Sequence, residues 1–244
     1  VLSRIKLLMG RSNIQQRKNE IVDQFGPWTS HNIKIAPDIY TISADHANRA
    51  SCRAALYADL INMFLGKING KRILDLGCLE GGISLYLAEL GGRCTGVDAR
   101  NYHLEKARFA SDCLRLSRRV SWVCGDINNQ STWDNLRKFD VIICSGILYH
   151  ISEKSLSPLF LRMRKYCKTN ALLVIDTNIT RSPDATFDLP DGTRLHGKIW
   201  SEHKEDATKD EKFQAGWSSI EENNAFWLTE RSLSNLAIKS GFGS

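Results

Sequence analysis

The sequence feature that most constrains the fold is an apolar run at residues 72–76, which carries an acid and leads into a glycine-rich turn. The turn reads Gly-Cys-Leu-Glu-Gly-Gly over residues 77–82, and residues 83–90 place apolar side chains at helical spacing. The pattern predicts a buried strand, a tight turn and the start of a helix. Such a turn lets backbone N–H groups approach a ligand closely, so it is a candidate binding site.

The same alternation of strand and helix continues along the chain as far as residue 176. Helical segments separate the apolar runs, which is typical of right-handed βαβ units and a parallel sheet. We therefore predict an α/β fold with a doubly wound, mostly parallel sheet. The predicted strands are residues 73–76, 93–98, 120–124, 139–144 and 171–176.

The two flanks of this region differ from it. Residues 1–70 are predicted to form a mainly helical cap on the substrate side, with the main domain at 71–244. The cap contains an irregular segment at 25–33 that is either a lid or site wall, or a surface turn with its tryptophan packed inside. Residues 177–216 are polar and rich in turn residues, which predicts a lid-like insertion before the last strands.

Composition excludes several classes of protein. An apolar content of 42% with 25% charged residues is ordinary for a globular protein, and no apolar run has the length of a membrane helix. The seven cysteines are scattered and never form a C-x-x-C pair, which predicts a cytoplasmic protein without a disulfide framework, a zinc site or another metal site. The net charge of +6 leaves open whether the basic clusters at 115–119 and 162–168 are solvated faces or contact an anionic partner.

Three acids lie on or just after predicted strands, where ligands bind in open α/β sheets. Asp98 lies 21 residues after Gly77, at the end of the second strand, where a carboxylate can accept both hydroxyls of a ribose. Asp126 follows the third strand, where it can accept from an adenine amino group. Each acid alone is common as a cap or turn residue, but together with the glycine turn they predict a nucleoside site.

The glycine spacing discriminates between nucleoside cofactors. A nicotinamide-binding turn reads G-x-G-x-x-G, whereas the glycines here are Gly77, Gly81 and Gly82. Asp75 also precedes the turn, where its carboxylate opposes a pyrophosphate but suits an ammonium or sulfonium group. A nicotinamide oxidoreductase is therefore the least favoured alternative.

These residues resemble the class I S-adenosylmethionine-dependent methyltransferases over about residues 70–180. "ILDLGCLEGG" is similar to the first motif of that family, "GVDAR" to its ribose acid and "CGDIN" to its adenine-side acid. "FDVIICSGILYHI" is similar to the fourth-strand motif and "ALLVIDT" to the fifth strand. The resemblance implies a Rossmann-like, seven-stranded sheet, S-adenosylmethionine as cofactor and S-adenosylhomocysteine as product.

The resemblance also implies roles for individual residues. Gly77 would border the methionine part of the cofactor, with Asp75 near its ammonium group. Asp98 would hold the ribose diol, and Asp126 with Ile127 would hold the adenine. The loop at 145–150 would close over the methyl donor. The other implied cofactor-binding residues are Cys78, Gly81, Ala99, Ser145 and Gly146.

The flanks carry a looser likeness. "FGPWTSHNIKI" and "GWSSIEENNAFWLTERSLSNLAIKSGF" resemble bacterial methyltransferases related to the tRNA wobble-uridine carboxymethyltransferase group, some of which act on small molecules or glycans. Leu79 and Glu80 depart from the family's first motif, which more often has a smaller residue followed by Asp or Gly.

We predict methyl transfer from S-adenosylmethionine to an O or N atom of a small or medium-sized acceptor, such as a natural product, sugar or metabolite. His150 is the candidate general base, because it follows the fourth strand and histidine exchanges protons near neutral pH, although a pocket wall or a substrate contact is the more common role for such a residue. The alternatives are modification of a tRNA base and a non-catalytic cofactor-binding module, and the oligomeric state is open. Candidate substrate contacts are Trp28, His31, Tyr149, His196 and Trp200.

Overall fold

The computed structural model describes residues 2–45 and 49–243. The chain divides into two compact units, Val1–Cys124 and Gly125–Ser244, which are described separately below. The predicted division at residue 70 stays a prediction.

A five-stranded sheet in the order β5-β4-β3-β6-β7 is the central feature of the fold. Within it β3 pairs in parallel with β4, β4 with β5, and β6 with β7. The α/β class and the mostly parallel sheet are therefore confirmed, because buried apolar runs and intervening helices lead to this arrangement. The strands are β3 (Arg72–Leu76), β4 (Arg93–Asp98), β5 (Val120–Cys124), β6 (Phe139–Ser145) and β7 (Cys167–Asp176).

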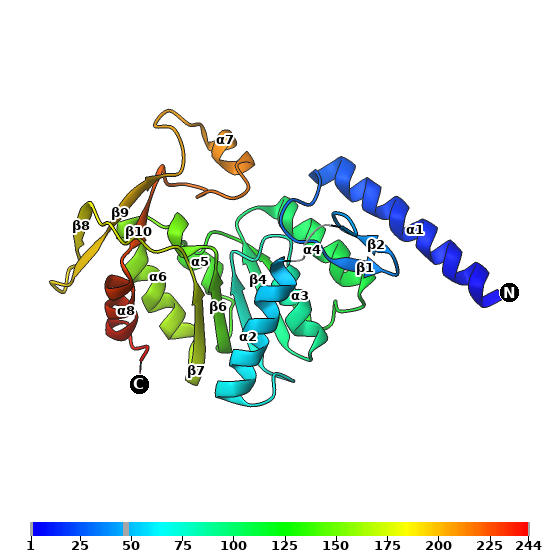
Figure 1. Ribbon diagram of the computed structural model, residues 1–244, viewed down its shortest axis with the longest axis horizontal. Coiled ribbons are helices and arrows are strands. Elements are labelled where there is room, and N and C mark those ends of the chain that lie inside the picture. The colour runs from blue at the N-terminus through cyan, green and yellow to red at the C-terminus, as the bar shows by residue number, and fades with distance from the viewer. Residues whose placement is uncertain (1, 46–48, 244) are drawn as a thin grey trace. The chain divides into compact units, whose positions relative to one another are not determined.

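Unit 1 surrounds β3, β4 and β5 with helices. The helix α2 packs against α3, which lies on β3 and β4, and α1 packs against α4. In Figure 1 the small hairpin of β1 and β2 lies beside α4, and the two strands pair antiparallel. The other elements of the unit are α1 (Leu2–Phe25), β1 (Lys34–Ala36), β2 (Ile39–Tyr40), α2 (Arg49–Leu65), α3 (Gly82–Glu89) and α4 (Asn101–Cys113).

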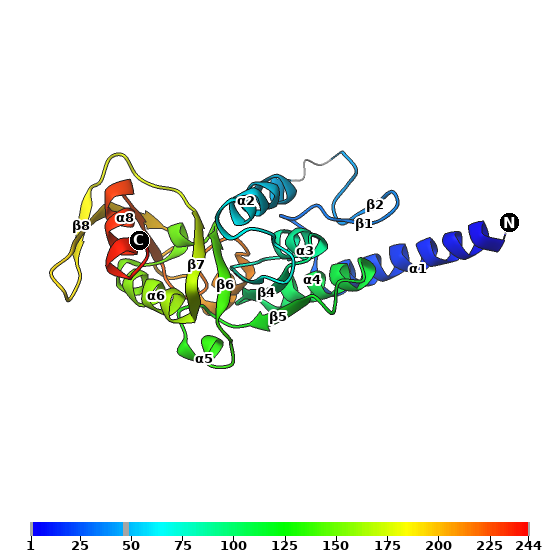
Figure 2. The ribbon, with the colours of Figure 1, turned by 90° about the horizontal axis from the view of Figure 1, so that it is seen from below.

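Unit 2 combines β6 and β7 with a second, antiparallel sheet of order β10-β9-β8. The helix α8 packs against β9 and β10, as Figures 1 and 2 show, and α6 packs against α8. The other elements are α5 (Gln130–Trp133), the 3₁₀ turn η1 (Leu148–His150), α6 (Glu153–Tyr166), β8 (Ala185–Asp188), β9 (Arg194–Ser201), α7 (Lys209–Gln214), β10 (Asn224–Leu228) and α8 (Glu230–Lys239).

The central sheet has five strands instead of the predicted seven. The insertion at 177–216 contains the regular elements β8, β9 and α7. The chain reverses between β8 and β9 in a turn closed by the Leu189 N–H, which donates to the Thr193 carbonyl (2.8 Å). The other edge of β9 pairs with β10, so the last strands form a sheet of their own instead of extending the central one. The seven-strand expectation is thus corrected to five strands and a separate sheet of three.

None of the helices in the described part of the chain combines the length and the apolar character that a membrane crossing demands.

Candidate functional site

The glycine turn of unit 1 adopts the left-handed backbone conformation at three positions. Gly77 has φ 66°, Leu79 φ 46° and Gly81 φ 77°, and the last of these is the residue before α3. Glycine adopts such angles without a steric penalty, whereas leucine rarely does. The Cys78 N–H donates to the Val97 carbonyl (3.0 Å), which ties the turn to β4.

Gly81 also makes room for a tryptophan from β5. A Cβ atom at Gly81 would lie 2.4 Å from the indole of Trp122, and one at Gly96 would lie 2.6 Å from the same ring. The turn therefore needs glycine at 81 for packing as well as for its backbone angles. No local pattern in the sequence marks Trp122, because its contact with the two glycines depends on the pairing of β4 with β5.

Asp98 is 5% exposed, and its carboxylate is already hydrogen bonded within the unit. It accepts the backbone N–H groups of Leu79 (2.9 Å) and Arg100 (2.9 Å), and His103 Nδ1 lies 3.2 Å from Oδ1. Asp98 thereby links the turn after β3 to the start of α4. The residue after it, Ala99, is half-buried.

Asp75 is 2% exposed and bonded to Ser84, whose hydroxyl donates to Oδ2 (2.7 Å). Burial raises the pKa of this carboxyl to about 7, although the bonds from Ser84 lower it and the nearby charge of Asp98 raises it further. A cation placed near Asp75 would favour its ionised form. This environment suits the role that the resemblance implies, beside the ammonium group of the cofactor.

The two candidate substrate contacts of unit 1 are both buried. Trp28 is 4% exposed and packs on Phe109 with ring centroids 5.9 Å apart, inside a core cluster of the unit. His31 is 7% exposed, and its Nδ1 accepts the Gly82 N–H (2.8 Å) at the start of α3. Burial lowers the pKa of His31 to about 4, so the ring is neutral near neutral pH. In this structure both side chains serve the packing of unit 1, and their contact with substrate stays a prediction.

In unit 2 Asp126 offers an unused acceptor. Its Oδ1 accepts the Asn128 N–H (2.8 Å), whereas the buried Oδ2 has no hydrogen-bond partner among the described residues. Burial raises the pKa of this carboxyl. Ile127 is 7% exposed, and its carbonyl accepts the Trp133 Nε1–H (2.9 Å). A buried acceptor without a donor beside an apolar side chain suits the predicted contact with adenine.

The end of β6 forms a turn at the next two candidates. Gly146 has φ 71°, and its N–H donates to the Asp176 carbonyl at the end of β7 (2.8 Å). The Ser145 hydroxyl donates to Asp176 Oδ2 (3.4 Å). These bonds hold the start of the loop at 145–150.

His150 is paired with a carboxylate that sequence analysis did not identify. Its Nδ1 lies 2.7 Å from Glu202 Oε2, and the side chains are 16% and 4% exposed respectively. Glu202 Oε2 also accepts the Ser219 N–H (3.1 Å), which fixes its position. Because a carboxylate only accepts, Nδ1 is the donor in this contact, and in the neutral form of the ring Nε2 then has a lone pair. This arrangement can remove a proton from an acceptor.

Aromatic side chains lie next to this pair. Tyr149 contacts the ring of His150, with centroids 4.3 Å apart, and its carbonyl accepts the Trp227 Nε1–H (2.9 Å). Trp227 in turn stacks on Trp200, with ring centroids 4.4 Å apart and an angle of 18° between the ring planes. Glu202 follows β9 directly, and Trp200 lies near the end of that strand. Trp200 is 44% exposed and is therefore available to a ligand.

His196 lies apart from this group. It is six residues from Glu202, on the order of 20 Å along an extended strand. Its side chain is exposed, while its N–H donates to Ser232 Oγ (2.8 Å). The structure thus brings together Tyr149, His150 and Trp200 but not His196.

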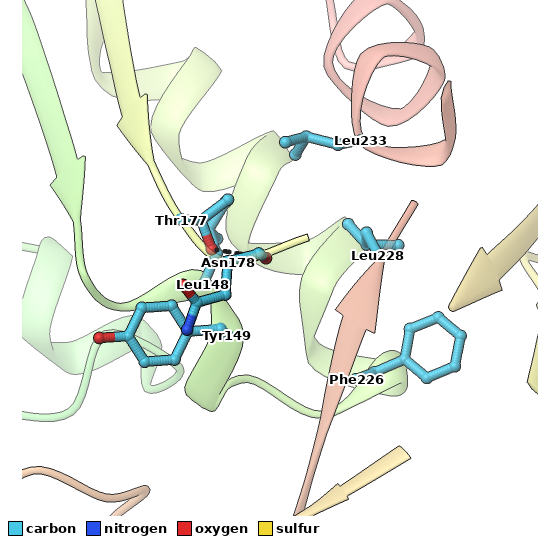
Figure 3. Close-up of a pocket in the computed structure, with 7 residues that line it drawn as sticks. All are labelled: Leu148, Tyr149, Thr177, Asn178, Phe226, Leu228 and Leu233. Atoms are coloured by element: carbon cyan, nitrogen blue, oxygen red, sulfur yellow. Dashed lines mark hydrogen bonds between the residues drawn. The ribbon is translucent and has the colours of Figure 1, made fainter. Parts of the chain in front are cut away.

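A small pocket lies behind η1 in unit 2. It encloses about 180 Å³, including its open mouth, and is lined by Leu148, Tyr149, Thr177, Asn178, Phe226, Leu228 and Leu233. In Figure 3 Thr177 and Asn178 lie against Leu148. Leu228 comes from β10 and Leu233 from α8, and the phenol ring of Tyr149 points away from these two leucines. Ligand pockets usually have about 300–1,000 Å³, so this pocket is too small for a whole ligand.

Comparison with known proteins identifies the family. A family model described as a methyltransferase domain matches residues 49–243. The mitochondrial ubiquinone biosynthesis O-methyltransferase of Schizosaccharomyces pombe is 36% identical over 110 residues, which cover 45% of this chain and 38% of that enzyme. The match thus spans well under half of the relative's length.

Solved structures agree over most of the chain. The N-terminal domain of EvdMO1, crystallised in the presence of SAH and D-fucose, is 25% identical with a TM-score of 0.69, covering 95% of this chain and 87% of that one. The glycopeptide N-methyltransferase MtfA, complexed with S-adenosylmethionine, shares the fold at 15% identity and a TM-score of 0.54, covering 82% and 88%. The predicted cofactor, S-adenosylmethionine, is therefore confirmed. The chain belongs to the class I S-adenosylmethionine-dependent methyltransferases.

Proposed function

We propose that the chain transfers the methyl group of S-adenosylmethionine to a hydroxyl oxygen of a small, ring-bearing acceptor, with His150 as general base. The observation that carries this proposal is the 2.7 Å contact between His150 Nδ1 and Glu202 Oε2. A hydroxyl must lose its proton as it is methylated, and an oriented histidine can take that proton. A role in binding alone would not require this pair.

The reaction balances with the groups of this chain. The acceptor oxygen attacks the methyl carbon while its proton passes to His150 Nε2, and Glu202 stabilises the resulting imidazolium. The bond between the methyl group and sulfur breaks with its electron pair left on sulfur, which gives S-adenosylhomocysteine. The methyl group of a sulfonium is already activated, so alignment of the two reactants supplies much of the remaining help.

Two further observations support a ring-bearing hydroxyl compound. The partly exposed indole of Trp200, stacked on Trp227, offers a flat apolar surface, and sugar or aromatic rings can stack on such a surface. EvdMO1 was crystallised with D-fucose, and the ubiquinone enzyme is an O-methyltransferase. Modification of a tRNA base stays an alternative prediction, cytoplasmic location stays a prediction, and the oligomeric state stays open.

A labelled methyl donor tests the proposal. We expect label from S-adenosylmethionine to appear on D-fucose or on a phenol such as catechol, and not on an aliphatic amine of similar size. His150→Gln should lower the rate by about 10²–10⁴-fold, since it removes the proton acceptor. Transfer confined to the amine, or an undiminished rate in His150→Gln, would contradict the proposal.

A further inference from the structure

The backbone of residues 27–31, here called the N-terminal clasp, closes around one side chain of the glycine turn. That side chain is Glu80, which is 0% exposed. Its carboxylate accepts three consecutive backbone N–H groups of the clasp at 2.8, 3.0 and 2.8 Å. The donors are Thr29, Ser30 and His31.

A lysine of α4 completes the clasp. Lys106 Nζ lies 3.7 Å from Glu80 Oε1 and donates to the Pro27 carbonyl (2.7 Å), and the lysine is 2% exposed. A buried carboxylate is tolerated only when its acceptor positions are satisfied, and here backbone donors and an ammonium group satisfy them. The site is therefore built for a negative charge at position 80.

Glu80 directly follows the strained residue of the turn. Leu79 has φ 46°, an angle that residues with a Cβ rarely adopt. Its N–H is held by Asp98 Oδ2 (2.9 Å), and the residue after it is held by the clasp. Leu79 is thus fixed from both sides. Strain of this kind persists only where the surroundings enforce it, and it is frequent at ligand sites.

We propose that Glu80 is a positioning residue for the cofactor: the clasp, through Glu80, holds the turn at Leu79 in the conformation that binds S-adenosylmethionine. Free of the clasp, the turn relaxes away from the left-handed angle of Leu79, and cofactor binding must then restore it. The clasp therefore strengthens cofactor affinity without contacting the reacting atoms. This inference rests on the proposed function in so far as it requires the chain to bind S-adenosylmethionine. It does not depend on the identity of the acceptor.

Calorimetric titration with S-adenosylhomocysteine tests the inference. Glu80→Gln keeps the shape of the side chain but loses the charge and turns its amide hydrogens towards donors of the clasp. We expect its Kd to rise about tenfold, equivalent to the loss of one charge-assisted hydrogen bond. Adding Leu79→Gly, which adopts the turn angle without strain, should recover most of that loss.

Arg115→Gly is the matched control. Arg115 is an exposed residue of the same unit with φ 58°, so glycine relieves the same kind of strain away from the turn. In the Glu80→Gln background it should raise the unfolding temperature and leave the weakened Kd unchanged. Equal recovery of affinity by both glycines, or no recovery by Leu79→Gly, would overturn the inference, as would an unchanged Kd in folded Glu80→Gln.

Two further measurements separate the outcomes. If Glu80→Gln does not fold, Glu80→Asp keeps the charge on a shorter side chain and should raise the Kd by about threefold; an unchanged Kd there also overturns the inference. If the unaltered chain fails to bind S-adenosylhomocysteine, the proposed function fails. If it binds and only the Glu80 result is absent, the positioning role alone fails.

Discussion

The two units hold their candidate site residues in different ways. In unit 1 the carboxylates of Asp75, Asp98 and Glu80 are buried and hydrogen bonded to groups of the same unit. In unit 2 Asp126 keeps a buried oxygen without a partner among the described residues, and Trp200 is 44% exposed. The fold itself thus sets the shape of the cofactor turn, whereas Asp126 and Trp200 in unit 2 keep groups available to a ligand.

Mutations around the glycine turn and mutations around His150 should therefore have different effects. Changes around the glycine turn should alter cofactor affinity, because they alter a shape that exists before binding. Changes around His150 should alter the chemical step or the recognition of the acceptor.

After His150→Gln, the largest expected effect in unit 2 is that of Glu202→Gln. The amide cannot stabilise the imidazolium that His150 becomes, so kcat should fall by about 10²-fold with little change in the Kd for S-adenosylhomocysteine. Steady-state kinetics of methyl transfer check this. The control is Glu221→Gln, because Glu221 is an exposed glutamate of the same unit, and this variant should keep full turnover. If Glu221→Gln were as slow as Glu202→Gln, Glu202 would have no specific role in the chemical step.

In unit 1 the pKa of Asp75, raised to about 7 by burial, predicts pH-dependent cofactor binding. Only the ionised carboxylate attracts an ammonium group, so affinity is present above pH 7 and is lost as the pH falls through that value. The Kd for S-adenosylhomocysteine should be about tenfold weaker at pH 6 than at pH 8. Calorimetry at both pH values measures this, and Asp75→Asn should remove the dependence. A persisting dependence in that variant would exclude Asp75 as its source.

The smallest expected effect concerns the stacked tryptophans. Trp200→Ala removes the exposed face of the stack, and we expect KM for the acceptor to rise about fivefold with kcat little changed. Trp217→Ala is the matched control, because Trp217 is 59% exposed and belongs to the same unit. Equal changes in KM for the two variants would show that the stack has no special part in acceptor binding.

The parallel sheet and the identity of the cofactor could be predicted from the sequence because their signals are local. The glycine turn, the acid in β3 and the acid that ends β4 lie within one stretch, and the five parallel strands follow from apolar runs between helices. The roles of these residues came from a resemblance to a family, and they stay predictions until a bound cofactor is seen.

The acceptor half was predicted less completely because its residues meet only through folding. Glu202 is 52 residues from His150, and Trp227 is 78 residues from the carbonyl of Tyr149. The strand β9 contains Gly197 and two charged residues, Arg194 and Lys198, which obscured its alternation, although that glycine is required where Phe226 packs against it. No local pattern links Glu80 to the clasp either, since the contact spans about fifty residues.

The most direct test of the account compares Asp98→Asn with His150→Gln, measuring the Kd for S-adenosylhomocysteine and kcat for each. Asp98→Asn should weaken binding by at least about tenfold, because the predicted ribose contact loses its charge. His150→Gln should leave the Kd within about twofold of the unaltered chain while kcat falls by about 10²–10⁴-fold. A large loss of cofactor affinity in His150→Gln, or full turnover in that variant, would contradict the division of roles between Asp98 and His150.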